Sequence, residues 1–227
     1  MTPAKARSSL SREVVADQAI ALADTEGLDA VTIRRLAGDL GVTPMALYWH
    51  FRTKDELLAG AADRVLEGLV LPANKAETWP EELRVLMVEL VRVLSAHPQL
   101  VELVAQRTLA GAPGLEMTER ALAALDEAGF PKDEAARLAG HAMKTAMALA
   151  TGDLVDDSGM SSDEREEHLR QKRSMLSALP SEKYPMLVRC ADFITYCADP
   201  REFYTLGVEH FVAGIVGLAD RRSVGAR

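Results

Sequence analysis

The sequence predicts an all-α protein, and three observations support this fold class. Ala and Leu, which favour helices, supply 65 of the 227 residues. Aromatic residues, which are enriched in strands, make up only 5% of the chain. Apolar residues recur at helical spacing along most of the sequence, and Gly and Pro residues mark the ends of these segments. No segment has a pattern that would support a strand.

The first 71 residues are predicted to form four helices, at residues 11–26, 33–40, 44–51 and 53–71. Thr32 caps the second helix, and Gly41 ends it after barely two turns. Thr43 followed by Pro44 is a start signal for the third helix, because Pro fits the first helical position. The sequence Thr53–Glu56 has the spacing of a capping box and begins the fourth helix.

Six further helices are expected after Pro72, at residues 79–96, 100–106, 116–128, 131–150, 184–198 and 200–219. The helix at 131–150 is apolar nearly all round, since Lys144 is the only fully charged residue between Leu138 and Ala150. Such a helix is expected to be buried on several sides. The segment 153–167 contains seven acidic residues and is interpreted as a solvated loop or a weak helix.

Composition and charge exclude several classes of protein. The net charge is -8, which argues against nonspecific nucleic-acid binding over the whole surface, although residues 1–60 are nearly neutral and leave room for a local site. No apolar run approaches the roughly 18 residues of a membrane span, and no secretory signal begins the chain. We therefore expect a cytoplasmic protein without a membrane partner.

The sequence predicts no enzyme, cofactor or metal site. It contains no glycine-rich phosphate loop, no nucleophile with a nearby base and no paired-His spacing. Cys190 and Cys197 lie seven positions apart in one predicted helix, about 10 Å along its axis, which is too far for a disulfide. Two small buried hydrophobic residues are a better interpretation of these cysteines than a redox sensor.

The second and third helices have the layout of a helix-turn-helix, in which the later helix is offered to the major groove of DNA. Ala37 is small enough to let the two helices cross closely. At about 100° per residue, Leu47 and Phe51 share one face of the third helix. If that face meets the core, the outward residues are Met45, Tyr48 and Trp49. The alternative is a helical hairpin covered by another part of the protein.

Four sequence segments in this region resemble the DNA-binding domain of TetR-family repressors. They are Val31–Ala37, Gly41-Val42, Ala46–Phe51 and Lys54–Leu58. The resemblance spans roughly residues 10–60, and its Leu-Tyr-Trp-His stretch is most similar to the branch that contains the tetracycline repressors. The sequence Ala128-Gly129-Phe130 before a long buried helix is similar to the regulatory domain of that branch.

The resemblance implies a ligand-responsive repressor, a homodimer that binds palindromic operator DNA and is released by a small-molecule effector. Arg34 matches a base-contacting position, and a guanidinium can bind guanine bidentately. The positions that match phosphate contacts are Tyr48, His50 and Lys54. Thr43 and Met45 begin a third helix with few polar side chains, so more of the specificity is expected from Arg34, Thr43 and DNA shape. The predicted DNA-facing set also includes Trp49.

The resemblance implies two domains, a DNA-binding domain at residues 1–56 and an all-helical ligand-binding and dimerisation domain at residues 57–227. For the ligand cavity we expect His141 and Thr145 as polar markers among apolar walls from Met87, Leu90, Val104 and Met117. The metal-chelating His of the tetracycline repressors has no counterpart, since Val104 or Gln106 occupies the nearest positions. A tetracycline ligand is therefore not expected.

The helix at 131–150 has two faces that suggest two partners. Its Ala-rich face, together with the last helix, is assigned to a dimeric four-helix seam, because small residues let helices approach closely. An intramolecular core is the alternative for this face. The alternative function for the whole chain is an all-α small-molecule-binding or interaction protein that does not bind DNA. Exposed Tyr48 and Trp49 beside Arg34 and Lys54 favour the repressor.

Overall fold

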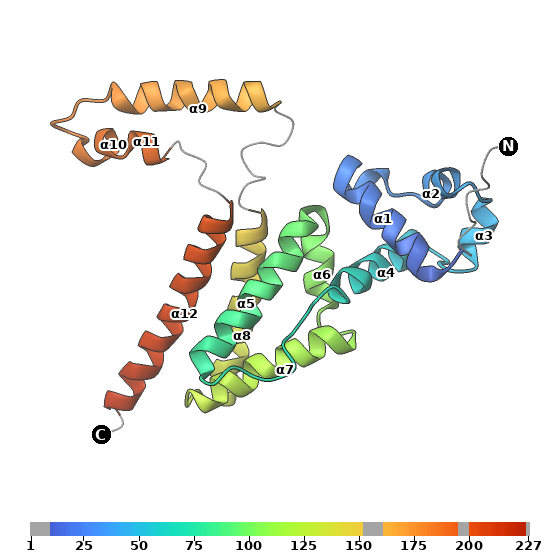
Figure 1. Cartoon of the computed structure of the whole chain (residues 1–227), viewed down its shortest axis with the longest axis horizontal. Helices are drawn as coiled ribbons and strands as arrows, with labels where there is room; N and C mark the ends of the chain where they lie inside the picture. Colours follow the sequence, from blue (N-terminus) through green and yellow to red (C-terminus); the bar gives the residue numbers. More distant parts are fainter. Residues whose placement is uncertain (1–9, 152–160, 195–199, 226–227) are drawn as a thin grey trace.

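The computed structural model describes residues 10–151, 161–194 and 200–225, and the secondary structure of these residues is entirely helical. The predicted all-α fold class is confirmed. A group of short helices at the N-terminal end of the chain adjoins a body of longer helices (Figure 1). A smaller arm of helices lies beyond one end of the last helix in the same view.

The N-terminal group contains the four predicted helices and one turn of 3-10 helix. Their bounds are α1 Arg12–Glu26, η1 Leu28–Ala30, α2 Ile33–Leu40, α3 Pro44–Tyr48 and α4 Lys54–Leu66. Residues from all four α-helices and from the turn that follows α3 meet in one core, where the largest fully buried side chains are Val15, Leu36, Leu47, Phe51 and Leu57. Burying each of these side chains contributes about 1.5–3 kcal/mol, so this core holds the short helices together.

Side-chain caps fix three of these four helix starts. The hydroxyls of Ser11, Thr32 and Thr53 accept hydrogen bonds from the backbone N–H three residues later, at 3.3, 3.1 and 3.0 Å. Each such cap contributes about 1 kcal/mol. Thr43 precedes α3 with an extended backbone, but its side chain makes no capping hydrogen bond.

Two of the predicted helices end earlier than expected. The sequence predicts that the third helix extends to Phe51, but α3 ends at Tyr48, and residues 49 and 50 form a turn whose His50 carbonyl bonds to Arg12 of α1. We predicted that the fourth helix continues towards Leu71, but α4 ends at Leu66, after which Gly68 and Leu69 bond to carbonyls only three residues back. The predicted domain boundary at residues 56 and 57 falls inside α4, and nothing in the fold tests it.

The body is built around two long helices, α5 (Trp79–Ala96) and α8 (Lys132–Thr151), which pack against each other. Around them pack α6 (Val101–Arg107), after the 3-10 turn η2 (Pro98–Leu100), then α7 (Ala112–Glu127) and α12 (Pro200–Gly225). Figure 1 shows α12 running along one side of the body. The prediction for α5 is confirmed at both ends. Helix α7 begins four residues before its predicted start, with Pro113 in its first turn.

The remaining helices form the arm, α9 (Ser162–Ser177), α10 (Pro185–Arg189) and α11 (Ala191–Ile194), which pack against one another. The sequence predicts a loop or weak helix at 153–167; residues 153–160 lie outside the described residues, and those from 162 are helical, with a reciprocal capping box between Ser161 and Glu164 at the start. The predicted single helix at 184–198 is interrupted at Cys190, which is half-buried with a free thiol. Cys197 lies outside the described residues.

The chain between α4 and α5 is fixed to the body by two guanidinium–carboxylate pairs. Glu89 accepts a hydrogen bond from the backbone N–H of Val70 and pairs with Arg92, which donates to the carbonyl of Gly68. Glu82, which is buried, accepts from the backbone N–H of Ala76 and pairs at 2.6 Å with the buried Arg120.

Arg120 also donates to the carbonyl of Pro72, so both pairs hold the backbone of this connection. Burial alone raises the pKa of Glu82, but its hydrogen bonds from Arg120 and the Ala76 N–H outweigh burial and lower that pKa overall. The carboxylate that holds the connection is therefore ionised in the folded protein.

Gly60 provides a test of packing in the N-terminal core. A Cβ atom at Gly60 would lie 2.5 Å from Cε1 of Phe51, and the Phe51 ring is fully buried. Gly60→Ala should therefore cost about 1–3 kcal/mol of unfolding free energy, which exceeds the roughly 1 kcal/mol that Ala gains over Gly in a helix.

The matched control is Gly38→Ala in α2, where a Cβ atom would meet no atom within 4 Å. This variant should gain about 0.5–1 kcal/mol. Urea unfolding followed by circular dichroism measures both variants. A Gly60→Ala protein as stable as the Gly38→Ala protein would show that the Phe51 ring gives way.

Candidate nucleic-acid interface and ligand cavity

The crossing of α2 and α3 has the geometry that the sequence predicts for a helix-turn-helix. Gly41 adopts a left-handed conformation with φ 66°, and the N–H of Val42 bonds to the Ala37 carbonyl at 2.9 Å. Only Gly takes this conformation without strain. Ala37 is buried, and α2 packs directly against α3. The short turn therefore fixes the direction in which α3 points.

The outward face of α3 is apolar and uncovered. Leu47 and Phe51 are fully buried, whereas Met45, Tyr48 and Trp49 are 67%, 46% and 85% exposed. The alternative of a hairpin covered by another part of the chain is therefore wrong for the residues that the structure describes. Exposed large apolar side chains in one cluster indicate a surface that packs against a partner.

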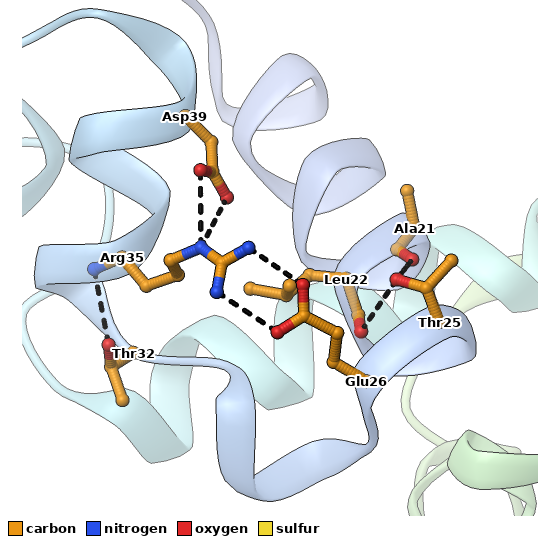
Figure 2. Close-up of polar contacts among 7 residues, drawn as sticks. All are labelled: Ala21, Leu22, Thr25, Glu26, Thr32, Arg35 and Asp39. Atoms are coloured by element: carbon orange, nitrogen blue, oxygen red, sulfur yellow. Dashed lines mark hydrogen bonds and ion pairs between the residues drawn. The ribbon is translucent and has the colours of Figure 1, made fainter.

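Neighbouring arginines of α2 have different environments. Arg35 is held between two carboxylates: its terminal nitrogens bond to Glu26 at 2.7 and 3.0 Å, and its Nε bonds to Asp39 (Figure 2). These partners, Glu26 first, raise the pKa of Arg35. Arg34 is exposed and makes no hydrogen bond or ion pair within the described ranges. Helix α2 thus uses Arg35 to attach itself to α1 and leaves Arg34 available.

The other predicted DNA-facing residues lie around the same end of the N-terminal group. Thr43 is exposed, and its hydroxyl is not used as a cap. His50 is half-buried, and its carbonyl accepts a hydrogen bond from Arg12. Lys54 is exposed, and its Nζ donates to the carbonyl of Leu28 at 3.3 Å. Nothing in the structure tests their contacts with DNA, so these assignments stay predictions.

Sequence reasoning missed Arg12, which joins the turn after α3 to the start of α1. Its guanidinium lies 4.1 Å from the centre of the Phe51 ring and pairs with Glu56 at 3.1 Å. Glu56 in turn accepts from the backbone N–H of Arg52 at 2.9 Å, and these two contacts lower its pKa. The sequence shows only an uncompensated basic residue near the N-terminus, which gives no sign of this structural role.

A cavity of about 380 Å³ lies between α5, α7 and α8 and reaches the end of α6. The residues that line it are Leu83, Leu86, Met87, Leu90, Thr108, Leu109, Met117, Thr118, Ala121, Leu122, Ala136, Ala139, Gly140, Ala142 and Met143. Three predicted wall residues, Met87, Leu90 and Met117, are among them. This volume is within the usual range of small-molecule sites.

The other three predicted ligand residues do not line this cavity. Val104 is fully buried beside it, His141 is exposed and Thr145 is half-buried. The face of α8 that meets the cavity carries Ala139 and Gly140, and His141 and Thr145 lie on roughly the opposite side of the helix. Their assignment to a ligand site stays a prediction.

The polar side chains that do line the cavity are Thr108 and Thr118, which sequence reasoning missed. Thr118 could have been predicted, because it belongs to a stripe at helical spacing, formed by Met117, Thr118, Ala121 and Leu122. Thr108 follows a short helix, and its position depends on the close approach of α6 and α7. No local pattern marks such an approach.

Part of the Ala-rich face of α8 lies in the core of the single chain, as in the alternative that the sequence left open. Ala135, Ala146 and Leu149 are buried, and a Cβ atom at Gly207 of α12 would collide with the Leu149 side chain. Leu138 and Ala142 of the same face are only partly buried, so the assignment of this face to a dimeric seam stays a prediction. Helix α12, the other half of the predicted seam, exposes Phe203 and Leu206 at 50% and 59%.

The described ranges lack two features. None of their helices combines the length and apolar character needed to cross a membrane. They also contain no cluster of three His, Cys, Asp or Glu residues suited to holding a metal ion.

The chain was compared with known protein families. Residues 15–61 match the family described as bacterial regulatory proteins, tetR family, and residues 71–218 match the tetracyclin repressor-like C-terminal domain. The chain belongs to the TetR family. It is therefore a DNA-binding transcription regulator, as the resemblance implied, and the alternative of a helical protein that does not bind DNA is not supported.

Individual TetR-family relatives resemble most of the chain. An HTH-type transcriptional regulator of Saccharopolyspora erythraea is 29% identical over 214 residues, which are 92% of this chain and 86% of that protein. The class C tetracycline repressor protein of Escherichia coli is 26% identical and covers 92% and 91% of the two chains. The crystal structure of the Streptomyces coelicolor TetR-family protein ActR in complex with actinorhodin has a TM-score of 0.76 at 28% identity, over 92% and 96% of the two chains.

The exposure of Trp49 predicts its fluorescence response. Iodide should quench Trp49 strongly in the free protein, and bound DNA should shield it, because the indole would lie against sugar and phosphate. A Trp79→Phe protein, in which Trp49 is the remaining indole, should show both effects. DNA fragments selected for binding from a genomic library serve as the partner.

The Trp49→Phe protein is the matched control, since it keeps only the half-buried Trp79 at the start of α5. It should lose most of the DNA response while keeping its circular dichroism spectrum. A DNA response that survives Trp49→Phe undiminished would place the bound DNA elsewhere.

Proposed function

We propose that this TetR-family protein is a repressor that binds a palindromic operator as a homodimer and releases it when an effector occupies the cavity between α5, α7 and α8. One observation carries the DNA-binding part of the proposal. Met45, Tyr48 and Trp49 are exposed at α3, and α2, which packs against α3, carries an exposed arginine, Arg34, that has no partner in the described part of the chain. A surface that is both apolar and cationic suits the groove and backbone of DNA.

Each predicted residue then has a chemical role in the complex. Arg34 reads a guanine through its O6 and N7 atoms, and Thr43 and Met45 contact base edges and thymine methyls. Tyr48, His50 and Lys54 hold phosphates. The 3.3 Å bond from Lys54 to the Leu28 carbonyl is long for a charged donor, so a phosphate can replace that carbonyl.

A homodimer would cover the apolar face that α12 exposes. Phe203 and Leu206 lie on this face, together with the partly exposed Leu218. Large apolar side chains left in water on one helix indicate an interface. A two-fold dimer pairs the same surface of both copies and would present two α3 helices to two half-sites. Such a regulator acts where the chromosome is, in the cytoplasm.

The effector is expected to act through α6, which connects the cavity to α4. Thr108 lines the cavity, and the preceding residue, Arg107, pairs with Asp63 of α4 through two hydrogen bonds of 2.8 and 2.9 Å. Asp63 holds Arg107 in its charged form and raises the pKa of Arg107. A ligand that binds against Thr108 therefore acts on the end of α6 whose Arg107 holds α4, and α4 leads back to α3.

Substitution of Arg34 and Lys54 separates base contacts from phosphate contacts. Arg34→Ala should lose about 1–3 kcal/mol of binding to selected operator DNA and much less on random DNA. Lys54→Ala should weaken both similarly and reduce the salt dependence by about one phosphate. Electrophoretic mobility shifts at several salt concentrations measure both variants. Arg170→Ala, on the exposed surface of α9, is the control. Equal losses for Arg34→Ala on both DNAs would contradict its assignment.

A large side chain placed in the cavity tests, without a ligand, whether occupation of the cavity acts through α6 on α4. Ala121 of α7 lines the cavity, so Ala121→Phe should imitate an effector and lower operator affinity by about 5- to 150-fold. Arg107→Gln in the same protein should reduce this effect, because the link to Asp63 is lost. The same DNA-binding assay serves as readout.

The control for this test is Ala112→Phe, which places the same ring at the exposed start of α7, away from the cavity. It should bind operator like the unmodified protein. An effect of Ala121→Phe that persists in full with Arg107→Gln would exclude the proposed path.

A further inference from the structure

The lining of the cavity contains no ionisable side chain, which limits the charge of its ligand. Its lining residues are aliphatic, glycine, methionine and threonine. A charge moved from water into such surroundings loses its hydration without gaining a partner, which costs several kcal/mol. The lining therefore disfavours a carboxylate, a phosphate or an ammonium group.

The buried charged groups next to the lining in sequence, Glu82 and Arg120, are already engaged with each other. Arg120 precedes Ala121 on α7, but its Nε pairs with Glu82 and its Nη1 bonds to the carbonyl of Pro72. Its Nη2 is buried and makes no hydrogen bond within the described part of the chain. Arg120 itself does not line the cavity. Its Nη2 is nevertheless the group that would bind an anionic ligand, so the test includes an anionic probe.

Both polar side chains of the lining have already used their only hydrogen-bond donor. The Thr108 hydroxyl donates to the carbonyl of Val104 at 3.1 Å, and the Thr118 hydroxyl donates to the carbonyl of Gly114 at 2.8 Å. A hydroxyl that donates its proton retains oxygen lone pairs and can only accept a further bond. The side chains of the cavity thus offer acceptors, and a complementary ligand must supply an O–H or N–H.

The acceptor at Thr108 is also fixed in place. A Cβ atom at Gly114 would lie only 1.9 Å from the Thr108 carbonyl oxygen, so the first turn of α7 packs directly on the backbone of the α6 end. Thr108 is itself buried. An acceptor that is held by its surroundings discriminates between ligands better than a mobile one, because little entropy is lost on binding.

The apolar part of the lining favours a flat aromatic ligand. Met87, Met117 and Met143 bring three thioethers to the cavity, from α5, α7 and α8. Thioethers are polarizable, adapt their shape and make favourable contacts with aromatic rings. No aromatic side chain lines the cavity to compete for them.

We infer that the effector is an uncharged, largely aromatic molecule that donates a phenolic O–H or an N–H hydrogen bond to Thr108 or Thr118. This inference rests on the proposed function, in which the cavity is the effector site. The volume of about 380 Å³ has room for several fused rings.

Three probes with the same ring system test this inference: 1-hydroxypyrene, 1-methoxypyrene and 1-pyrenecarboxylate. At neutral pH the first is an uncharged donor, the second lacks the donor and the third is an anion. Pyrene fluorescence follows binding to the full-length protein without exciting its tryptophans. We expect 1-hydroxypyrene to bind about 2- to 10-fold more tightly than 1-methoxypyrene. The carboxylate should bind at least about 10-fold more weakly than the phenol.

Variants assign the preference to the two hydroxyls. Thr108→Val and Thr118→Val preserve side-chain shape and remove an acceptor, so at least one should abolish the difference between the phenol and its methyl ether while leaving the affinity for the ether nearly unchanged. Thr25→Val is the matched control, because the Thr25 hydroxyl makes the same bond to the carbonyl four residues back, in α1. It should leave the preference intact.

Four outcomes would overturn the inference: equal binding of all three probes, preference for the carboxylate, no binding of any probe, or a phenol preference that survives both Thr→Val variants. Preference for the carboxylate would identify Arg120 as the recognising group. Probe binding is measured without DNA, and operator binding is measured separately. A protein that shows the expected probe preference but binds no operator would contradict the proposed function and leave the ligand chemistry standing.

Discussion

The arrangement of the whole molecule depends on α4, which has to pack against two partners at once. Two adjacent residues of this helix bond to different parts of the molecule. Arg64 bonds to Asp17 of α1, and Asp63 bonds to Arg107 of α6. Helix α4 contacts both α1 and α6 along its length. The N-terminal helices and the body therefore share one element, and neither can shift along α4 without breaking the charged hydrogen bonds that join it to α4.

Much of the fold follows from local sequence signals. Thr32, Thr53 and Gly41 mark helix ends through contacts with residues three to five positions away, and the structure confirms them. Local signals fail where a distant contact decides the outcome. Helix α3 stops short of its predicted end at a turn whose His50 carbonyl bonds to Arg12, 38 positions earlier in the chain. The acidic run at 162–167 lacks an apolar stripe and becomes helical through its capping box.

The same division applies to the functional surfaces. The outward direction of Met45 and Trp49 could be predicted because the helical repeat alone fixes it relative to Leu47. The lining of the cavity could be predicted only in part, because it depends on which face of α8 meets α5 and α7. Sequence also gives no means of telling Arg34 from Arg35. The difference arises from Glu26, which lies nine positions before Arg35 on another helix.

Because the connection between α4 and α5 is held in place, α4 can tilt about its C-terminal end. With Gly68 and Val70 held by Arg92 and Glu89, the C-terminal end of α4 is anchored to the body, and rotation about that end is the freedom that remains. The 13 residues of α4 span about 20 Å. A tilt of roughly 5° at the anchored end displaces its far end, and α3 beyond it, by about 2 Å, which is enough to break hydrogen bonds that tolerate only a few tenths of an ångström. Because a small tilt of α4 becomes a larger displacement of α3, a small apolar molecule bound in the cavity can control how the polar DNA-binding surface fits its partner.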